Sequence, residues 1–209
     1  MEILEQNIPL THSVLSESLK EYTRLNDKIS YLMKKGELYS LAKGKYVTKQ
    51  AIKNNLFLKY QAANILYGPS YISRYSALSF YGLLSESTTI VESMTMKRSK
   101  IIDNNLGSFH FFSQPTQAVF PVGVESKKMS DDCSMLIANP AKAICDIIWT
   151  TPNLFLSSME DLIYLLEDDI RLEISLLKNT DLSQMEYCVQ FGKKKKDIQL
   201  LLTLIKNLQ

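Results

Sequence analysis

The hydrophobic positions between Leu25 and Met33 form a single helical stripe. Leu25, Ile29, Leu32 and Met33 fall at i, i+4, i+7 and i+8, and Gly36 follows as a residue that can end a helix in the left-handed conformation. The pattern therefore predicts an amphipathic helix with one buried face. The opposite face carries cationic and hydrogen-bonding side chains: Arg24, Asp27, Ser30, Tyr31, Lys34 and Lys35, with Lys28 on its flank.

A tight β-hairpin is predicted directly after this helix. Residues 38–41 and 45–47 have the composition of two short strands, and Ala42-Lys43-Gly44 supplies the turn between them. Lys43 and Lys45 are therefore expected at the hairpin tip.

A shorter helix is predicted upstream, from Ser13 to Lys20, with Ser13 as its N-cap and residues 21–23 as the turn into the second helix. Two helices followed by a lysine-bearing hairpin outline a winged helix-turn-helix, in which the second helix enters the DNA major groove and the hairpin forms the wing. The expected DNA contacts are Thr23, Arg24, Asp27, Lys28, Tyr31, Lys34, Lys35, Lys43 and Lys45.

The middle of the chain predicts a small mixed domain. Residues 51–66 form a predicted connecting helix that stops at Gly68-Pro69, and another helix is expected from Ser73 to Gly82. Four β-rich runs bounded by turn residues predict a small sheet, with strands within residues 88–94, 108–113, 119–127 and 134–138.

A further helix is predicted over residues 140–149, with Pro140 at its start. Lys142 and Asp146 fall on one side of this helix, at the i, i+4 spacing of an exposed ion pair. We therefore expect both side chains to face solvent. The apolar side consists of Ala143, Ile144, Ile147 and Ile148.

The C-terminal region reads as helices. An apolar stripe from Met159 to Leu166 is interrupted by Glu167-Asp168-Asp169, which we expect to be exposed, and Ile198 to Ile205 form a final amphipathic helix. Residues 71–209 are thus predicted as one mixed domain with a helical end, joined by a connector over 51–70 to a DNA-binding domain over 1–50. The predicted fold class is α+β.

Two further groups of cations are candidate anion contacts. Lys97, Arg98 and Lys100 lie beside a predicted strand and form either a second phosphate contact or an ordinary loop. A run of four lysines precedes the last helix, where cations are unfavourable because of the helix dipole. That run is either a solvated cluster or a contact for RNA, DNA or an acidic protein. Its members are Lys193, Lys194, Lys195 and Lys196.

Charge is segregated along the 209-residue chain, although the net charge is only +2. Residues 20–60 hold ten basic side chains against three acidic ones, whereas residues 157–181 hold two against seven. A basic segment that also predicts a helix-turn-helix has the electrostatic footprint of phosphate binding, where counterion release makes affinity salt-dependent.

Composition excludes several classes of protein. A hydrophobic content of 45% permits a full core. No apolar run approaches the ~18 residues of a membrane span, and the first residues lack the order of a signal peptide, so we expect a soluble cytoplasmic protein. The three cysteines and two histidines are too scattered for a disulfide framework or a zinc site. We expect buried thiols, structural histidines and no cofactor. These residues are Cys133, Cys145, Cys188, His12 and His110.

One pattern is compatible with catalysis. Glu125 and Lys127 alternate on a predicted strand and therefore share a face, and Asp103 lies upstream. This loosely resembles the carboxylate-x-lysine arrangement of metal-dependent nucleases. Because a metal site needs convergent ligands that this spacing does not supply, a non-enzymatic protein is the favoured interpretation.

Three stretches of the chain are similar to the AbiE-type antitoxins of type IV toxin-antitoxin systems and to related predicted transcriptional regulators. The first runs from Leu32 to Leu38 and into residues 43–46. The second comprises Tyr71-Ile72-Ser73, Ser76-Ala77-Leu78 and Tyr81-Gly82-Leu83, and the third comprises residues 137–143 with Asp146. Together they span about residues 10 to 149.

This resemblance implies an antitoxin that represses its own operon through an N-terminal winged helix and counteracts a nucleotidyltransferase-like toxin. Its implied partners are double-stranded promoter DNA and, functionally, the toxin. Lys34, Lys35, Lys43 and Lys45 occupy the family's basic recognition helix and wing. A stand-alone regulator without a toxin is the alternative, and either a monomer or a homodimer would suit the operator.

Overall fold

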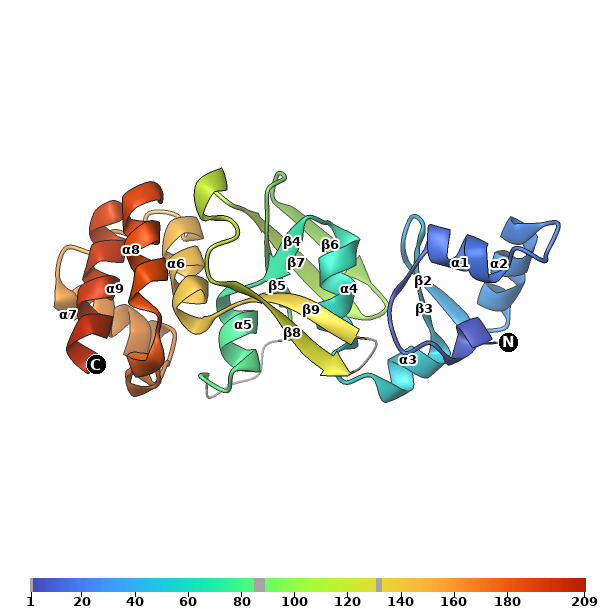
Figure 1. Ribbon diagram of the computed structural model, residues 1–209, viewed down its shortest axis with the longest axis horizontal. Helices are drawn as coiled ribbons and strands as arrows, with labels where there is room; N and C mark the ends of the chain where they lie inside the picture. The colour runs from blue at the N-terminus through green and yellow to red at the C-terminus, as the bar shows by residue number, and fades with distance from the viewer. Residues whose placement is uncertain (1, 85–88, 131–132) are drawn as a thin grey trace.

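The structure, a computed structural model, describes residues 2–84, 89–130 and 133–209. Figure 1 shows an elongated molecule in which a small N-terminal region, a central sheet and a C-terminal group of helices follow one another in chain order. The chain is mixed α+β, and the described residues form two sheets. Within the described ranges, none of the helices has the length and apolar character needed to cross a bilayer.

The N-terminal region has a core of its own. Its elements are η1 (Glu2–Glu5), β1 (Leu10–Thr11), α1 (His12–Ser18), α2 (Leu25–Lys34), β2 (Leu38–Ala42) and β3 (Lys45–Thr48). The strands form an antiparallel sheet in the order β1-β3-β2. The buried side chains that hold these elements together are Ile3, Leu10, Leu15, Leu19, Ile29, Leu32 and Leu38.

The predicted helix, glycine stop and hairpin are confirmed. Gly36 has φ +67°, and the backbone N–H of Glu37 donates to the carbonyl of Leu32, which closes the end of α2 in a Schellman motif. The predicted N-cap of α1 is wrong. Thr11 caps this helix instead of Ser13, because the chain turns into α1 directly after β1 and the Thr11 hydroxyl accepts a backbone N–H of the first turn.

The single helix predicted over residues 51–66 is two helices, α3 (Lys49–Asn54) and α4 (Leu58–Leu66). Asn55 interrupts the helical hydrogen bonding, since its side-chain oxygen accepts the backbone N–H of Phe57 at 2.9 Å. Its side-chain nitrogen donates to the carbonyl of Asn7 at 2.6 Å. The side chain of one asparagine therefore ends the helix and ties the connector to the N-terminal region.

The central sheet has six strands in the order β6-β7-β5-β4-β9-β8. It is mixed, because β5 pairs with β7 and β4 with β9 in parallel, while the other pairs are antiparallel. The strands are β4 (Ser70–Ile72), β5 (Val91–Thr95), β6 (Lys100–Asn104), β7 (Gly107–Ser113), β8 (Val124–Ser130) and β9 (Cys133–Ala138).

The four predicted β-rich runs overlap β5, β7, β8 and β9, although residue 88 of the first run lies outside the described residues. The third predicted run begins too early, because residues 119–123 form the end of η2 (Gln117–Val119) and a turn before β8. β4 and β6 were not predicted from the sequence. β4 is a three-residue strand buried throughout, so it has no polar alternation, and β6 is an edge strand with mostly exposed side chains. The helix expected from Ser73 to Gly82 is α5 (Arg74–Phe80).

The expectation that Lys142 and Asp146 face solvent is wrong. In α6 (Pro140–Thr150), Asn139 caps the helix with Pro140 at its first turn. The side chains of Lys142 and Asp146 are only 2% and 0% exposed. Both are enclosed because α6 contacts α5, β9 and the C-terminal helices, so the side opposite the apolar stripe is covered as well.

The buried Asp146 carboxylate is the centre of a polar network. Lys142 Nζ donates to one carboxylate oxygen at 2.7 Å, and Gln114 Nε2 donates to the same oxygen at 3.0 Å. The hydroxyls of Tyr71 and Ser73 donate to the other oxygen at 2.9 and 2.7 Å. Four donors thus replace the water that a buried carboxylate loses. The second and third stretches of the family resemblance meet here.

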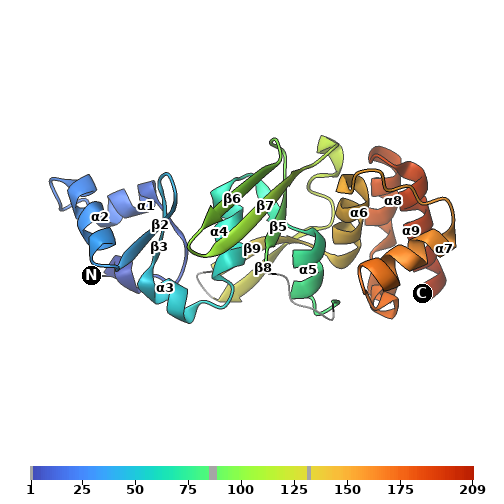
Figure 2. The same cartoon turned by 180° about the vertical axis from the view of Figure 1, so that it is seen from behind.

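The C-terminal helices lie at the end of the molecule opposite the N-terminal region (Figure 2). The acidic residues 167–169 are exposed, as predicted. Cys145 and Cys188 are buried thiols, as predicted, and nothing is described of the Cys133 side chain. The elements are α7 (Met159–Tyr164), η3 (Leu165–Asp169), η4 (Ile174–Asn179), α8 (Leu182–Phe191) and α9 (Lys195–Leu208), preceded along the chain by η2 (Gln117–Val119).

Candidate nucleic-acid interface

The outward face of α2 is polar and cationic. Ile29 and Leu32 are buried in the N-terminal core, whereas Met33, expected in the buried stripe, is 40% exposed. The apolar stripe is therefore narrower than its sequence spacing implied, and the free face of the helix is broader. The exposed side chains on this face include Asp27, Tyr31, Lys34 and Lys35.

Two tyrosines hold the cations of this face in place. Lys28 Nζ lies 4.4 Å from the ring centroid of Tyr22 and 5.4 Å from that of Tyr31. Lys35 Nζ lies 4.8 Å from the Tyr31 ring, and a hydrogen bond with the Tyr31 side chain raises the pKa of Lys35. The lysines are thus orientated by aromatic rings as well as by the helix. Tyr22 was not predicted, because its place in the turn gives no helical spacing to Lys28.

The start of α2 borders an open groove of about 420 Å³. Thr23 and Arg24 lie on it, and Arg24 approaches Asp27 at 3.9 Å with both side chains largely exposed. Such an exposed pair contributes little and leaves the guanidinium available. His12 also lines the groove, so the start of α1 contributes to this surface, which the sequence did not indicate.

The hairpin between β2 and β3 is fixed to α1. Gly44 has φ +70°, a conformation that favours glycine, and its carbonyl accepts the backbone N–H of His12 at 2.8 Å. Lys43 is exposed in the turn. Lys45, expected beside it at the tip, instead donates from Nζ to the carbonyl of Leu66 at 2.8 Å. Lys45 thus reaches back to the end of α4.

The two additional groups of cations are far apart. Lys97, Arg98 and Lys100 occupy the β5–β6 turn and the start of β6 and are exposed. The lysine run of residues 193–196 spans the start of α9, with Lys193 and Lys194 before the helix and Lys195 and Lys196 in its first turn, at the opposite end of the molecule from α2 (Figures 1 and 2). Lys97 and Lys100 lie beside Tyr67 and near Lys45 of the N-terminal region, so the two groups do not form one continuous anion contact.

The lysine run is not uniformly solvated. Lys194 Nζ donates to the carbonyls of Ile148, Thr151 and Leu154 at 2.8, 3.1 and 3.1 Å. It thereby satisfies backbone acceptors at and after the end of α6, a favourable position for a cation. Lys193, Lys195 and Lys196 are exposed. One lysine of the four is therefore structural.

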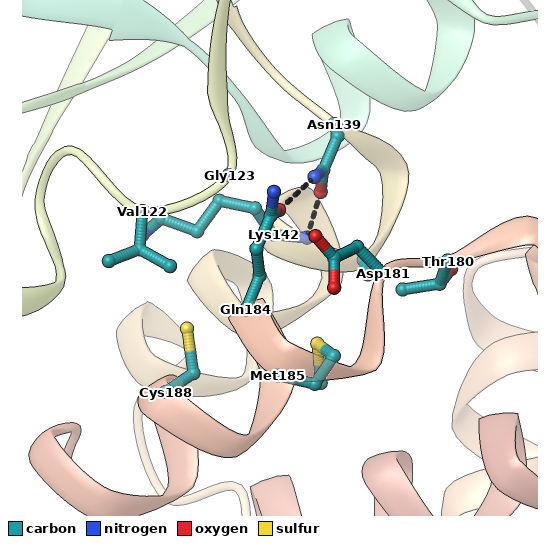
Figure 3. A pocket seen from close by; sticks show the side chains of 10 residues that line it. Val122, Gly123, Asn139, Lys142, Thr180, Asp181, Gln184, Met185 and Cys188 are labelled. Atoms are coloured by element: carbon teal, nitrogen blue, oxygen red, sulfur yellow. Dashed lines mark hydrogen bonds between the residues drawn. The ribbon is translucent and has the colours of Figure 1, made fainter.

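A cleft between α6 and α8 is a packing contact. Asn139 Nδ2 donates to Gln184 Oε1 at 2.7 Å, and Asn139 Oδ1 accepts the backbone N–H of Lys142 at 2.9 Å (Figure 3). The cleft leaves no space for a water molecule. Gly123 has φ +70°, and a Cβ at this position would lie 2.7 Å from Lys142 Cβ, so only glycine allows this close approach.

The carboxylates of the nuclease hypothesis do not converge. Asp103 lies on β6 and Glu125 on β8, which are the two opposite edges of the central sheet. Lys127 Nζ pairs with Glu125 at 2.6 Å. Among the described residues, no group of three or more His, Cys, Asp or Glu side chains could hold a metal ion. The Glu125, Lys127 and Asp103 side chains of this alternative therefore do not come together as a metal site in the described part of the chain.

Comparison with known proteins gives a fold relationship alone. No protein-family model matches the chain, and no curated protein matches it significantly. The crystal structure of the RV2827C protein from Mycobacterium tuberculosis matches with a TM-score of 0.52 and 16% sequence identity, over 94% of this chain and 76% of that one. The similarity extends over nearly the whole described architecture, from the N-terminal region to the C-terminal helices.

Proposed function

We propose that this chain is a DNA-binding transcriptional regulator whose N-terminal region acts as a winged helix-turn-helix. Helix α2 would be the recognition helix in the major groove, and the β2–β3 hairpin would be the wing against the adjacent backbone. The main support for this proposal is the exposed face of α2. Tyr31, Lys34 and Lys35 face solvent there, while the opposite side of the helix packs into the N-terminal core.

The lysines and the tyrosine of this face, together with Lys43 of the hairpin, suit defined contacts with DNA. Lys34 and Lys35 carry flexible ammonium groups that suit phosphate oxygens or the acceptors of guanine, and Tyr31 supplies a hydroxyl donor. Lys43 in the hairpin turn suits a phosphate. Lys45 is not assigned to the wing tip, because its ammonium is bonded to Leu66.

We further propose that the regulator is the antitoxin and autorepressor of a type IV toxin-antitoxin operon. The support is the resemblance of three stretches to AbiE-type antitoxins. Two of these stretches join in one network, where Tyr71 and Ser73, 75 and 73 positions before Asp146 in the chain, donate hydrogen bonds to its carboxylate. The similar residues therefore belong to one folded unit. No catalytic activity is assigned to the chain.

The decisive experiment is binding to the DNA upstream of the gene itself, measured by fluorescence anisotropy across a salt series with excess nonspecific competitor. The wild-type protein should prefer this DNA, and Lys34→Ala/Lys35→Ala should lower its affinity at least about tenfold, since each lost charge contact is worth ~1 kcal/mol or more.

The matched control is Lys178→Ala/Lys206→Ala, which removes two exposed lysines from the C-terminal helices and should leave binding unchanged. Equal affinity of the wild-type protein for promoter and competitor DNA would exclude self-regulation.

A separate test distinguishes an antitoxin from a stand-alone regulator. The adjacent gene is expressed alone and together with this chain, and growth is followed. Arrest that the chain relieves supports the antitoxin function. Relief should persist in Lys34→Ala/Lys35→Ala when both genes have foreign promoters, because neutralisation would then be independent of repression. If the product of the adjacent gene is not toxic, the antitoxin hypothesis is wrong and the stand-alone regulator is the remaining function.

A further inference from the structure

Three lysines from separate segments meet where the N-terminal region joins the central sheet. Lys45 comes from β3, Lys97 from the β5–β6 turn and Lys100 from the start of β6. All three lie at the C-terminal end of α4, around Leu66 and Tyr67. We name this group, Lys45, Lys97 and Lys100, the junction cluster.

Leu66 and Tyr67, two consecutive residues at the end of α4, contact all three lysines of the junction cluster. Lys97 Nζ and Lys100 Nζ lie 5.1 and 5.4 Å from the centroid of the same ring, that of Tyr67. Lys45 Nζ lies 2.8 Å from the carbonyl oxygen of Leu66. The Tyr67 ring packs edge-on against Phe111, with a centroid separation of 5.3 Å. The aromatic ring that gathers the cations is thus anchored on the central sheet.

The positive charges of the cluster are close enough to oppose one another. Burial lowers the pKa of Lys45, and the charges of Lys97 and Lys100 lower it further. Among the residues that the structure describes, no carboxylate forms an ion pair with any of these three lysines. The repulsion is therefore not offset by a neighbouring acid, and an anion bound between them would relieve it.

The end of α4 alone does not account for the cluster. A helix C-terminus carries the equivalent of about −0.5 elementary charge, which one ammonium group already exceeds. Lys45 takes up the Leu66 carbonyl directly. The positive charges of Lys97 and Lys100 are therefore not balanced by the helix end. Both ammonium groups lie over the Tyr67 ring, and an aromatic face attracts a cation much more weakly than a phosphate does.

We propose that the junction cluster binds a phosphate of the DNA backbone, so that the central region extends the DNA-binding surface beyond the wing. This inference rests on the proposed DNA-binding function. The cluster adjoins the proposed wing, since Lys45 follows Lys43 by two residues on the same hairpin. The backbone of a DNA strand that contacts Lys43 would therefore continue towards Lys97 and Lys100.

The test compares the wild-type protein with Lys97→Ala/Lys100→Ala on promoter DNA and on an unrelated duplex over a range of salt concentrations. Each lost phosphate contact reduces the slope of log affinity against log salt by about 0.9. We expect the magnitude of the slope to fall by about 1. The affinity should fall by the same factor on both duplexes, so that the preference for promoter DNA is retained. Lys97→Arg/Lys100→Arg should keep the wild-type slope.

The control variant Lys178→Ala/Lys206→Ala removes the same charge at the far end of the molecule and should leave the slope unchanged. If the wild-type protein binds promoter DNA but Lys97→Ala/Lys100→Ala has the wild-type affinity and slope, the inference is wrong and the proposed function stands. If the wild-type protein binds neither duplex, both are overturned. Because both substituted lysines are exposed, the variant should unfold at the wild-type urea concentration.

Discussion

Two lysine–carboxylate pairs of nearly equal length lie in different regions of the molecule and differ in environment. In the N-terminal region, Lys20 and Glu17 are 2.8 Å apart and more than 70% exposed. In the central region, Lys142 and Asp146 are 2.7 Å apart and at most 2% exposed. Water screens the first pair, whereas the carboxylate of the second has exchanged its water for four protein donors, one of which is Lys142. Distance alone therefore says little about what an ion pair contributes.

The same contrast separates the lysines of the two regions. On α2 and the β2–β3 turn, Lys34, Lys35 and Lys43 are exposed and available to a ligand. Towards the C-terminus, Lys142 donates to the buried Asp146 carboxylate, and Lys194 donates to backbone carbonyls near the end of α6. Under the proposed function the exposed lysines of α2 and the β2–β3 turn serve recognition, whereas the bonded lysines Lys142 and Lys194 serve the fold.

The largest expected effect is that of Asp146→Ala. The substitution leaves the Lys142 ammonium buried without its partner, so we expect the free energy of unfolding to fall by about 3–5 kcal/mol. Urea denaturation followed by circular dichroism would measure it. Glu17→Ala is the control, because it removes the carboxylate of the exposed pair and should leave the unfolding midpoint unchanged. If Glu17→Ala lowers the free energy of unfolding as much as Asp146→Ala does, burial does not distinguish the two ion pairs.

A smaller effect is expected for Lys194→Ala. Three carbonyls near the end of α6 would lose a charged donor, which corresponds to a loss of about 1–3 kcal/mol in the free energy of unfolding. Lys195→Ala, one residue further along, should not destabilise the protein, because its side chain is exposed at the start of α9, where a cation is unfavourable. Equal unfolding midpoints for the two variants would show that Lys194 behaves as an ordinary surface lysine.

The smallest effect on stability is expected for Lys34→Ala/Lys35→Ala. Neither side chain contributes to the core, so the urea midpoint should stay at the wild-type value even where DNA affinity falls. The same denaturation series measures this. A clear drop in the midpoint would mean that any loss of DNA binding reflects unfolding of α2 and would remove the basis for assigning these lysines to recognition.

The sequence predicted the local features of the candidate site well. The apolar spacing of Leu25, Ile29 and Leu32, the glycine at position 36 and the turn at 42–44 are all set by residues within a few positions of one another. These interactions are encoded in short segments, so helical period and turn chemistry suffice to predict them.

Features that depend on distant segments could not be predicted in the same way. An i, i+4 lysine–aspartate pair has the same spacing whether water or α5 covers it. A hint was nevertheless present, since α6 is apolar on nearly all sides and contains Ala141, Cys145 and Trp149 outside the expected stripe, which is typical of a buried helix. Lys97 and Lys100 were candidate phosphate contacts from the sequence, but their meeting with Lys45 had no such hint, because Lys45 and Lys100 are far apart in the chain and meet only through tertiary packing.

The elongated arrangement of the three regions has a consequence for regulation. Helix α2 and the C-terminal helices lie at opposite ends of the molecule, with the central sheet between them (Figure 1). A macromolecule held at one end therefore does not occlude the other end. Two such ligands would compete only if a coupling free energy were transmitted through the central sheet. In its absence, a ligand bound at one end would leave the affinity of the other end for its own ligand unchanged.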